Sequence, residues 1–432
     1  MAAQVLEVLA WGKRVGALAA DPRTGYYAFG YDRAWKRQGV DLAPLTMPVK
    51  DRREVFVFPN LPGATYCRLP AMVADGLPDD FGNALIDAWM ARQGVARSSI
   101  TALDRLAYMG RRGMGALEFR PSRGSHRESE VPLSMQVLVE EARRSVEGRI
   151  GTRAGEGESA AALANLIRVG TSAGGARAKA VIAWNPGNGE VRSGQFDAAP
   201  GFEHWLLKFD GVGRDSELGT GADYGRIEYA YHRMAVAAGI RIEPCRLLEE
   251  GGRAHFMTRR FDREVVEGVT VKHHLQTLCA MDHLDFKQRA THSYSQLFGV
   301  IARLQLGDDA MQEAFRRMAF NVMARNCDDH TKNLSFRLKP GGSWELAPAY
   351  DVTHAYNPSG EWTYQHLMSV NGKFAGIGRD DLLEEADRFG IPRPKEILHR
   401  VRAALENWLE FSREAALPAA TADRVAADFN LV

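Results

Sequence analysis

The sequence predicts an α+β fold in three parts, and three observations support this prediction. Residues 1–125 mix short strand-like and helix-like patterns, residues 126–262 carry alternating apolar strands beside a glycine-rich stretch, and residues 263–432 place apolar residues mainly at helical spacing. A chain of 432 residues is long enough for two or three packed domains. We therefore expect an N-terminal α+β subdomain, an α/β lobe and a mainly helical lobe.

The composition is that of an ordinary globular protein. Hydrophobic residues make up 45% and charged residues 25% of the chain. The formal net charge of +1 argues against a free-standing nucleic-acid binder, which usually carries a basic domain or stripe. The four cysteines form no C-x-x-C pair, and neither a signal peptide nor a bilayer-spanning segment is visible. We therefore expect a soluble protein of the reducing cytoplasm.

The N-terminal part is predicted to begin with a strand near residues 5–9. A second strand is predicted at 55–58, closed by prolines, and helices are predicted at 85–90 and 101–107. An amphipathic helix is expected at 135–146, within a polar connecting region.

The middle part is predicted to contain a helix at 161–167, a glycine-rich loop at 170–175 and strands at 180–184 and 204–209. In the last strand Lys208 faces away from the apolar side, and Glu228 begins the helix that follows. A strand lysine fixed by a helix glutamate is one way to hold nucleotide phosphates. A solvent-facing lysine and an exposed helix glutamate are the alternatives.

The last part is predicted to contain helices near 297–304 and 311–322, the second of which runs into Asn326. A strand at 334–338, a turn at 339–342 and a return strand at 344–346 follow.

The most informative pattern is Asp328-Asp-His-Thr-Lys-Asn333, followed beyond the predicted hairpin by Asp351. A carboxylate, an amide five positions later and a second carboxylate are the residues that phosphoryl transfer requires for a base and for Mg²⁺. A lone polar cluster is usually a surface turn, but here an apolar helix and an apolar hairpin flank it. A transition-metal site of Asp328, Asp329, His330 and Asp351 is the alternative, although oxygen ligands suit Mg²⁺ better.

Several motifs resemble those of the HipA-type serine/threonine kinase toxins. They are Leu77-Pro-Asp-Asp-Phe-Gly82, Gly170 to Lys179, Trp205-Leu-Leu-Lys-Phe209, Arg260-Phe-Asp-Arg263, Asp328 to Asn333 and Pro348-Ala-Tyr-Asp-Val352. The resemblance covers most of the chain, and the last two motifs are the most specific. It implies a protein-kinase-like two-lobed fold, with residues 1–125 as the N-terminal HipA-type subdomain, 126–262 as the nucleotide-binding lobe and 263–432 as the helical catalytic lobe.

The resemblance also implies roles for individual residues. Asp328 and Lys332 are the predicted catalytic residues, with Asp328 as the base, and Asn333 and Asp351 are the predicted Mg²⁺ ligands. The predicted contacts to ATP come from Ser172, Ala173, Gly174, Gly175, Lys208, Glu228, Phe261, His330 and Tyr350. Ser172 is the predicted site of autophosphorylation, and Thr171 is a rival acceptor.

By the same resemblance we expect the toxin of a toxin–antitoxin pair. Its substrate would be a translation component such as an aminoacyl-tRNA synthetase. Its partner would be a helix-turn-helix antitoxin of the HipB type, through which the complex meets operator DNA. A kinase for a small molecule or lipid, and a non-catalytic kinase-fold component of a DNA-bound repressor complex, are the alternatives.

Overall fold

The computed structural model describes residues 5–122, 133–146, 178–212 and 223–432. The chain forms two compact units. The first unit consists of Met1–Gly213, Met257–Gln276 and Leu338–Gly342, and the second of Arg214–Phe256, Thr277–Arg337 and Ser343–Val432. Within the described ranges, no helix is long and apolar enough to cross a membrane.

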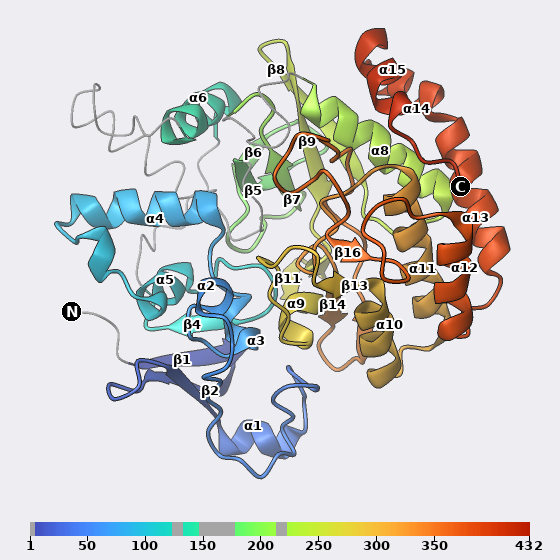
Figure 1. Cartoon of the computed structure of the whole chain (residues 1–432). Coiled ribbons are helices and arrows are strands. Elements are labelled where there is room, and N and C mark those ends of the chain that lie inside the picture. The colour runs from blue at the N-terminus through green and yellow to red at the C-terminus, as the bar shows by residue number, and fades with distance from the viewer. Residues whose placement is uncertain (1–4, 123–132, 147–177, 213–222) are drawn as a thin grey trace. The chain divides into compact units, whose positions relative to one another are not determined.

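The first unit begins with an antiparallel sheet whose strand order is β3-β2-β1-β4 (Figure 1). The strand predicted near residues 5–9 is present, and Leu6, Val8, Leu9 and Ala10 in it are buried. The strands are β1 (Val5–Ala10), β2 (Lys13–Ala20), β3 (Tyr27–Tyr31) and β4 (Glu118–Arg120). The helices around them are α1 (Arg33–Gln38), α2 (Gly63–Tyr66), α3 (Ala71–Ala74), α4 (Asp80–Arg92), the 3-10 turn η1 (Arg97–Ser99), α5 (Ala102–Met109) and α6 (Met135–Val146).

The predicted strand at 55–58 is wrong. Only Phe56 pairs with a neighbour, through an isolated bridge to Phe29. Phe56 is fully buried, whereas Val55 and Val57 are 56% and 37% exposed. Pro59 follows at once and cannot donate to a sheet, so the segment meets the edge of β3 through one residue.

A second sheet of the first unit contains β6, β5 and β7 in that order, all antiparallel. The bounds are β5 (Lys179–Trp184), β6 (Val191–Ser193) and β7 (Glu203–Lys208), which confirms both predicted strands. Every residue of β5 is buried, so both of its faces are covered. The register places Lys179 directly opposite Lys208.

Helices were expected to dominate after residue 263, but three short strands come first. They are β10 (Arg263–Val266), β11 (Val269–Lys272) and β12 (His274–Thr277), and β10 pairs with β11 as an antiparallel hairpin. The hairpin turns at Glu267 and Gly268, which both have positive φ. Two central residues with positive φ suit a two-residue hairpin turn, and β-branched valine and threonine favour the flanking strands.

The second unit is mainly helical and confirms the predicted helices and hairpin. Its helices are α8 (Tyr224–Ala238), α9 (Leu278–Met281), α10 (Tyr294–Arg303), α11 (Gly307–Met323), α12 (Arg379–Arg388), α13 (Pro394–Glu406), α14 (Trp408–Glu414) and α15 (Ala419–Ala427). Its strands are β8 (Cys245–Glu250), β13 (His292–Ser293), β14 (Ser335–Leu338), β15 (Trp344–Leu346) and β16 (Met368–Ser369), while β9 (Arg253–Arg259) continues into the first unit.

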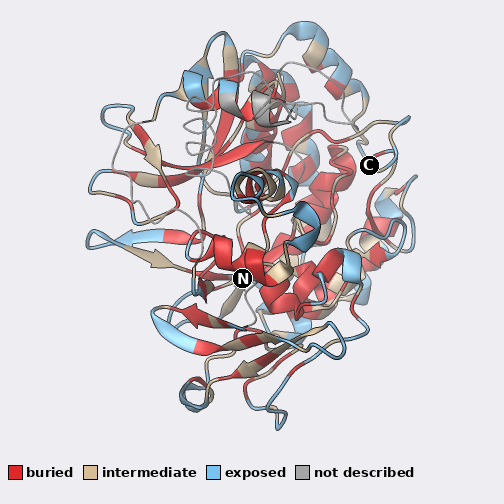
Figure 2. Ribbon diagram, turned by 90° about the vertical axis from the view of Figure 1, so that its left-hand side faces the viewer, coloured by how far each residue is buried: buried red, intermediate tan, exposed pale blue. Residues whose placement is uncertain are grey.

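Buried aromatic side chains stabilise this second unit. Tyr231 of α8 is fully buried and contacts Phe320, Trp408 and Phe429 edge-on, with ring centroids 5.5–6.4 Å apart. Its hydroxyl donates to the carbonyl oxygen of Ala324 at 2.6 Å, just before the predicted catalytic segment. Figure 2 shows buried positions in red along parts of many helices and strands, and exposed positions in pale blue at many turns.

Candidate active site

The segment from Asn326 to Asn333 follows α11 as a loop without regular structure. Arg325, directly before this segment, lies in the left-handed region with a φ of 54°, so the chain turns away from the helix axis. The backbone N–H of Cys327 donates to Ala355 at 3.0 Å, and the N–H of Ala355 donates to Arg325 at 3.1 Å. These bonds join the loop to the chain that follows Asp351.

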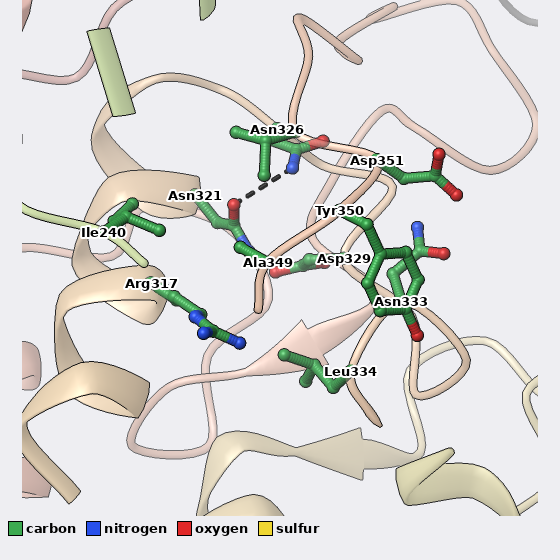
Figure 3. Close-up of a pocket in the computed structure, with 11 residues that line it drawn as sticks. Ile240, Arg317, Asn321, Asn326, Asp329, Asn333, Leu334, Ala349, Tyr350 and Asp351 are labelled. Carbon is green, nitrogen blue, oxygen red and sulfur yellow. Dashed lines mark hydrogen bonds between the residues drawn. The ribbon is translucent and has the colours of Figure 1, made fainter. Parts of the chain in front are cut away.

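A pocket of the second unit brings both predicted metal ligands, Asn333 and Asp351, together. Asn333, Tyr350 and Asp351 lie on one side of it, and Arg317 and Asn321 of α11 on the other (Figure 3). The remaining lining residues are Ile240, Asn326, Asp329, Leu334, Ala349 and Val352.

Three further predicted site residues belong to the same loop. The Asp328 side chain is 48% exposed, and its carboxylate lies 3.7 Å from Nε2 of His330. Nδ1 of His330 accepts the backbone N–H of Lys332 at 3.2 Å, which leaves Nε2 to carry the ring proton toward Asp328. The Lys332 ammonium lies 4.5 Å from the centre of the Phe286 ring, within cation–π range.

The predicted metal ligands fit Mg²⁺ chemically. Nδ2 of Asn333 donates to the backbone carbonyl of Asp328 at 2.8 Å, so the amide oxygen is left to act as an acceptor. Asp351 supplies a carboxylate to the same pocket. Mg²⁺ commonly takes one or two protein oxygens and completes its octahedron with phosphate and water. Asp351 has a φ of 53°, in the left-handed region that aspartate adopts more readily than most other non-glycine residues.

Tyr350 connects the loop to the hairpin that follows it. Its hydroxyl donates to the backbone carbonyl of Lys332 at 2.6 Å and is also hydrogen-bonded to the hydroxyl of Ser335. The first bond uses the phenolic proton, so the serine must donate the second. Tyr350 therefore fixes the chain between Lys332 and Ser335 beside the pocket.

Asp329 is used for anchoring rather than for binding a transition metal. Its residue is 2% exposed, and its carboxylate accepts hydrogen bonds from the backbone and from two side chains. Among the residues that the structure describes, no three or more His, Cys, Asp or Glu side chains are grouped to hold a metal ion. The transition-metal alternative for Asp328, Asp329, His330 and Asp351 is therefore unsupported.

Lys208 and Glu228 belong to different units. Lys208 ends β7 and is half-buried, opposite the buried Lys179, whose ammonium lies 3.9 Å from a carboxylate oxygen of Asp79. Glu228 is 2% exposed in α8. A Cβ added to Gly225 would lie 2.0 Å from the carbonyl oxygen of Ala254, so glycine lets this helix start against the strand. That Lys208 and Glu228 pair across the units stays a prediction.

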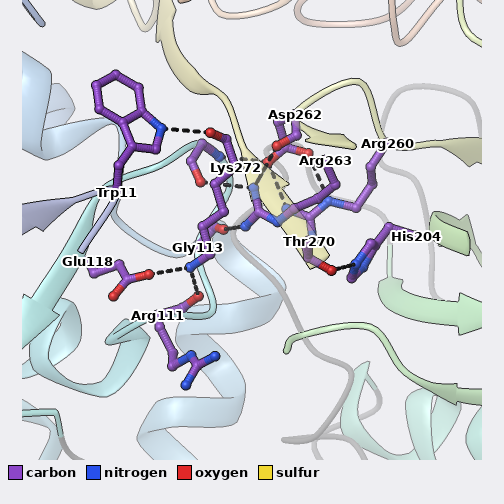
Figure 4. A network of polar contacts seen from close by, with 11 residues as sticks. Trp11, Arg111, Gly113, Glu118, His204, Arg260, Asp262, Arg263, Thr270 and Lys272 are labelled. Carbon is purple, nitrogen blue, oxygen red and sulfur yellow. Dashed lines mark hydrogen bonds and ion pairs between the residues drawn. The ribbon is translucent and has the colours of Figure 1, made fainter. Parts of the chain in front are cut away.

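Phe261 follows β9 in sequence, and its neighbours Arg260, Asp262 and Arg263 belong to a buried ionic network of the first unit (Figure 4). Asp262 accepts hydrogen bonds from Nε and Nη2 of Arg260, at 2.9 and 2.7 Å, and from Nη1 of Arg263 at 2.7 Å. It also accepts the backbone N–H of Gly115 at 2.7 Å. Burial would raise the pKa of Asp262, but the two arginines hold it well below the usual range.

The same network reaches the N-terminal sheet. Arg263 donates to the carbonyl oxygens of Gly113 and Gly115, at 2.8 and 2.9 Å. Lys272 donates to Glu118 of β4 at 2.7 Å, and burial lowers the pKa of Lys272 to about 8. The residues after Phe261 are therefore fixed to the segment from Gly113 to Glu118.

The predicted phosphate loop lies outside the described residues. This applies to Ser172, Ala173, Gly174 and Gly175, to Thr171 and to the helix predicted at 161–167. Their predicted roles stay predictions.

No site role is predicted from the sequence for Arg317, Asn321 or Asp262. The sequence of α11 could have indicated Arg317 and Asn321, because both place polar groups beside the apolar stripe of that helix. Asp262 belongs to the motif Arg260-Phe-Asp-Arg263, but its burial depends on residues far away in the sequence, such as Gly115.

Comparison with known proteins finds family models that match the N-terminal and the C-terminal regions of the chain. The "HipA N-terminal domain" model matches residues 6–120 and the "HipA-like C-terminal domain" model residues 171–409. The serine/threonine-protein kinase toxin HipA of Shewanella oneidensis is 24% identical over 198 residues, 41% of this chain and 45% of that protein. The match thus spans less than half of that relative's length.

The fold itself is shared with a solved structure. The chain matches a chain from the Shewanella oneidensis MR-1 complex of HipA, HipB and its operator DNA with a TM-score of 0.66 and 18% identity, over 98% of this chain and 94% of that one. This likeness confirms the predicted α+β, protein-kinase-like fold with an N-terminal sheet subdomain. Because the C-terminal family model covers more than half of the 432 residues, the chain belongs to the HipA family.

Proposed function

We propose that this chain is an ATP- and Mg²⁺-dependent protein serine/threonine kinase that acts as the toxin of a toxin–antitoxin pair in the cytoplasm. The observation that carries the proposal is the pocket shared by Asn333, Tyr350 and Asp351, directly beside Asp328. Membership in the HipA family supports the same conclusion.

In the proposed reaction, Asp328 orients the acceptor hydroxyl and accepts its proton. Asn333 and Asp351 would hold Mg²⁺, and Lys208, fixed by Glu228, would contact the nucleotide phosphates. When bound, Mg²⁺-ATP supplies the phosphoryl group, and the ion neutralises the charge that develops on the phosphate oxygens. Lys332 and His330 would add positive charge or hydrogen bonds beside Asp328.

The remaining proposed contacts are to the nucleotide base and phosphates. Phe261 would offer backbone hydrogen bonds to adenine, and Tyr350 would lie near the nucleotide. Ser172, Ala173, Gly174 and Gly175 would cover the phosphates, and Ser172 would be autophosphorylated. The assignment of residues 1–125, 126–262 and 263–432 to three parts belongs to the same proposal.

Partner and substrate follow from the relatives. The Shewanella oneidensis match was solved with HipB and operator DNA, so we propose a helix-turn-helix antitoxin of that type as the partner. Contact with DNA would run through the antitoxin, which is consistent with the net charge of +1 on this chain. The proposed substrate is a translation component such as an aminoacyl-tRNA synthetase.

The main test is incubation of the wild type and Asp328→Ala with Mg-ATP and a cell lysate, followed by phosphoproteomics. We expect new phosphoserine or phosphothreonine sites on lysate proteins with the wild type alone. Transfer to metabolite or lipid extracts instead would favour a small-molecule or lipid kinase. Stabilisation by ATP without transfer to any acceptor would favour a non-catalytic role in a repressor complex.

A second test concerns the first unit. An ATP analogue with a reactive acyl phosphate acylates lysines that lie beside the bound phosphates. We expect labelling of Lys208 that excess ATP prevents. The matched control is Lys179, which is opposite Lys208 in the sheet but is buried near Asp79. Labelling of neither Lys208 nor any residue of the Asp328 loop would contradict the proposed nucleotide site.

A further inference from the structure

The carboxylate of Asp329 is the most heavily bonded group of the predicted catalytic loop. One oxygen accepts the backbone N–H groups of Leu367 and Met368, at 2.7 and 3.4 Å. The other accepts the Tyr294 hydroxyl at 2.9 Å and Nδ1 of His366 at 3.0 Å. Asp329 therefore joins the loop to the start of α10 and to the start of β16.

A second chain of hydrogen bonds leads from the same place to the start of the loop. The Asn321 side chain donates to the Tyr294 hydroxyl at 2.9 Å, and the Asn326 side chain donates to Asn321 at 3.0 Å. Asn326 and Asp329 flank Cys327 and Asp328 in sequence. The segment that carries Asp328 is thus held on both sides by one buried network.

The part of the network around Asp329 is buried and carries opposite charges. The residues Asp329, His366 and Tyr294 are at most 2% exposed. Burial would lower the pKa of His366, but the neighbouring carboxylate of Asp329 outweighs this and raises it to about 10. An imidazolium thus faces a carboxylate in a site where each would be costly without the other.

The exposed Asp328 contrasts with this neighbour. Its side chain is 48% exposed, and its carboxylate lies 3.7 Å from Nε2 of His330. The placement of Asp328 therefore depends at least on the backbone that carries it. The anchored residues on either side restrict that backbone.

We propose that Asp329 and His366 are positioning residues, which hold the loop so that Asp328 meets the acceptor hydroxyl and Asn333 meets the metal. The inference rests on the proposed kinase function. It separates the two aspartates of the motif, since Asp328 would contact substrate and Asp329 would act only through the backbone. Neither Asp329 nor His366 would touch the nucleotide or the acceptor.

The test uses the full chain and three variants. His366→Asn replaces the imidazolium by a neutral amide whose nitrogen stands near the position of Nδ1 and can still donate to Asp329. Asp329→Asn removes the carboxylate at constant size. His232→Gln is the matched control, because His232 of α8 is also a buried histidine of the second unit. Its Nε2 lies 2.7 Å from the backbone oxygen of Glu243, which is not part of the Asp329 network.

The first measurement is the apparent kcat and KM for ATP, with dephosphorylated casein as the probe acceptor. We expect Asp329→Asn to lower kcat about 10- to 100-fold and to change KM for ATP much less, because a misplaced base slows chemistry more than binding. His366→Asn, which retains a donor, should lie between Asp329→Asn and the wild type. His232→Gln should keep the wild-type kcat. Equal kcat values for all four proteins would overturn the inference.

The second measurement is hydrogen exchange, which does not depend on activity. Peptides covering residues 326–334 and 366–369 should exchange faster in Asp329→Asn, whereas peptides of α8 should not change. If the wild type transfers no phosphate to casein or to lysate, the proposed function fails but this measurement still decides the inference. Unchanged exchange of the loop in Asp329→Asn would contradict it.

Discussion

The side-chain amide of Asn333 donates to the backbone carbonyl of Asp328 at 2.8 Å. The predicted metal ligand and the predicted base are thus joined by a bond within the loop. Because an asparagine amide has one donor end and one acceptor end, this bond decides that the oxygen of Asn333 is the group left for a cation.

Replacement of Asn333 by aspartate should open the loop although the size is unchanged. A carboxylate cannot donate to the Asp328 carbonyl, and two acceptors would face each other at this distance. We expect a loss of about 1–3 kcal/mol in unfolding free energy. Thermal melts of Asn333→Asp beside Asn357→Asp, a substitution outside the pocket, would measure it. Equal melting temperatures for both variants would show that the bond does not stabilise the fold.

Substitution of Asp328 should separate activity from stability. The side chain is 48% exposed, so Asp328→Ala should change the melting temperature little. Loss of a general base commonly lowers the rate about 10²- to 10⁴-fold. Phosphate transfer and melting temperature should therefore be measured on the same preparations. Retention of wild-type transfer by Asp328→Ala would remove this residue from the reaction.

The sequence predicts the loop, the helix before it and the hairpin after it because their signals are local. Apolar residues at helical spacing predict α11. Alternating apolar residues on both sides of Lys339 to Gly342 predict the hairpin, and the polar run between helix and hairpin predicts a connecting loop. Asn333 and Asp351 then meet in one pocket because the hairpin returns the chain.

Other features depend on contacts that no local pattern contains. The hairpin at Arg263–Lys272 was missed because its turn, Glu267-Gly268, lacks the usual asparagine or aspartate before glycine. The role of Asp329 requires His366, which is far away in the sequence. The burial of Asp262 likewise requires Gly115. Spacing alone cannot reveal such partners.

The His366 side chain should make stability depend on pH. Its pKa is about 10 in the folded state and about 6.5 in an unfolded chain. The raised value stabilises the fold fully below about pH 6.5, and this contribution is lost as the pH rises toward 10. The pKa of Tyr294, which also faces Asp329, is raised well above 10, so Tyr294 stays neutral across this window.

Urea unfolding of the wild type and His366→Asn from pH 6 to 10 would measure this effect. The difference between the two free energies should shrink with rising pH, by on the order of a few kcal/mol. Taking the difference cancels groups common to both proteins, such as Lys272, whose lowered pKa acts in the opposite direction. A constant difference over this range would mean that His366 is neutral in the fold.

Asp262→Asn should destabilise the first unit strongly. It would leave the buried guanidinium groups of Arg260 and Arg263 without their shared carboxylate. Removing one partner of a buried ion pair typically costs about 3–5 kcal/mol. Asp197→Asn is the matched control, since its pair with Arg111 is exposed and should be worth less than about 1 kcal/mol. Similar melting temperatures for both variants would contradict the prediction.

The positive φ of Asp351 allows its charge and its backbone strain to be tested separately. Asparagine tolerates the left-handed region better than most residues, and glycine adopts it without cost. We expect Asp351→Asn to keep the wild-type melting temperature. Asp351→Gly should keep the unfolding free energy or raise it by up to about 1 kcal/mol. Both variants should lose most of their phosphate transfer, because each removes the predicted carboxylate ligand of Mg²⁺.

Titration of MgCl₂ at fixed ATP would distinguish a metal ligand from a structural carboxylate. If Asp351 binds the ion, Asp351→Asn should need a higher Mg²⁺ concentration for half-maximal transfer than the wild type. Asp428→Asn serves as control, because that carboxylate bonds to His354 at 2.9 Å in the same unit and lines no part of the pocket. An unchanged Mg²⁺ requirement in Asp351→Asn, together with full activity, would assign its strained backbone to the fold rather than to catalysis.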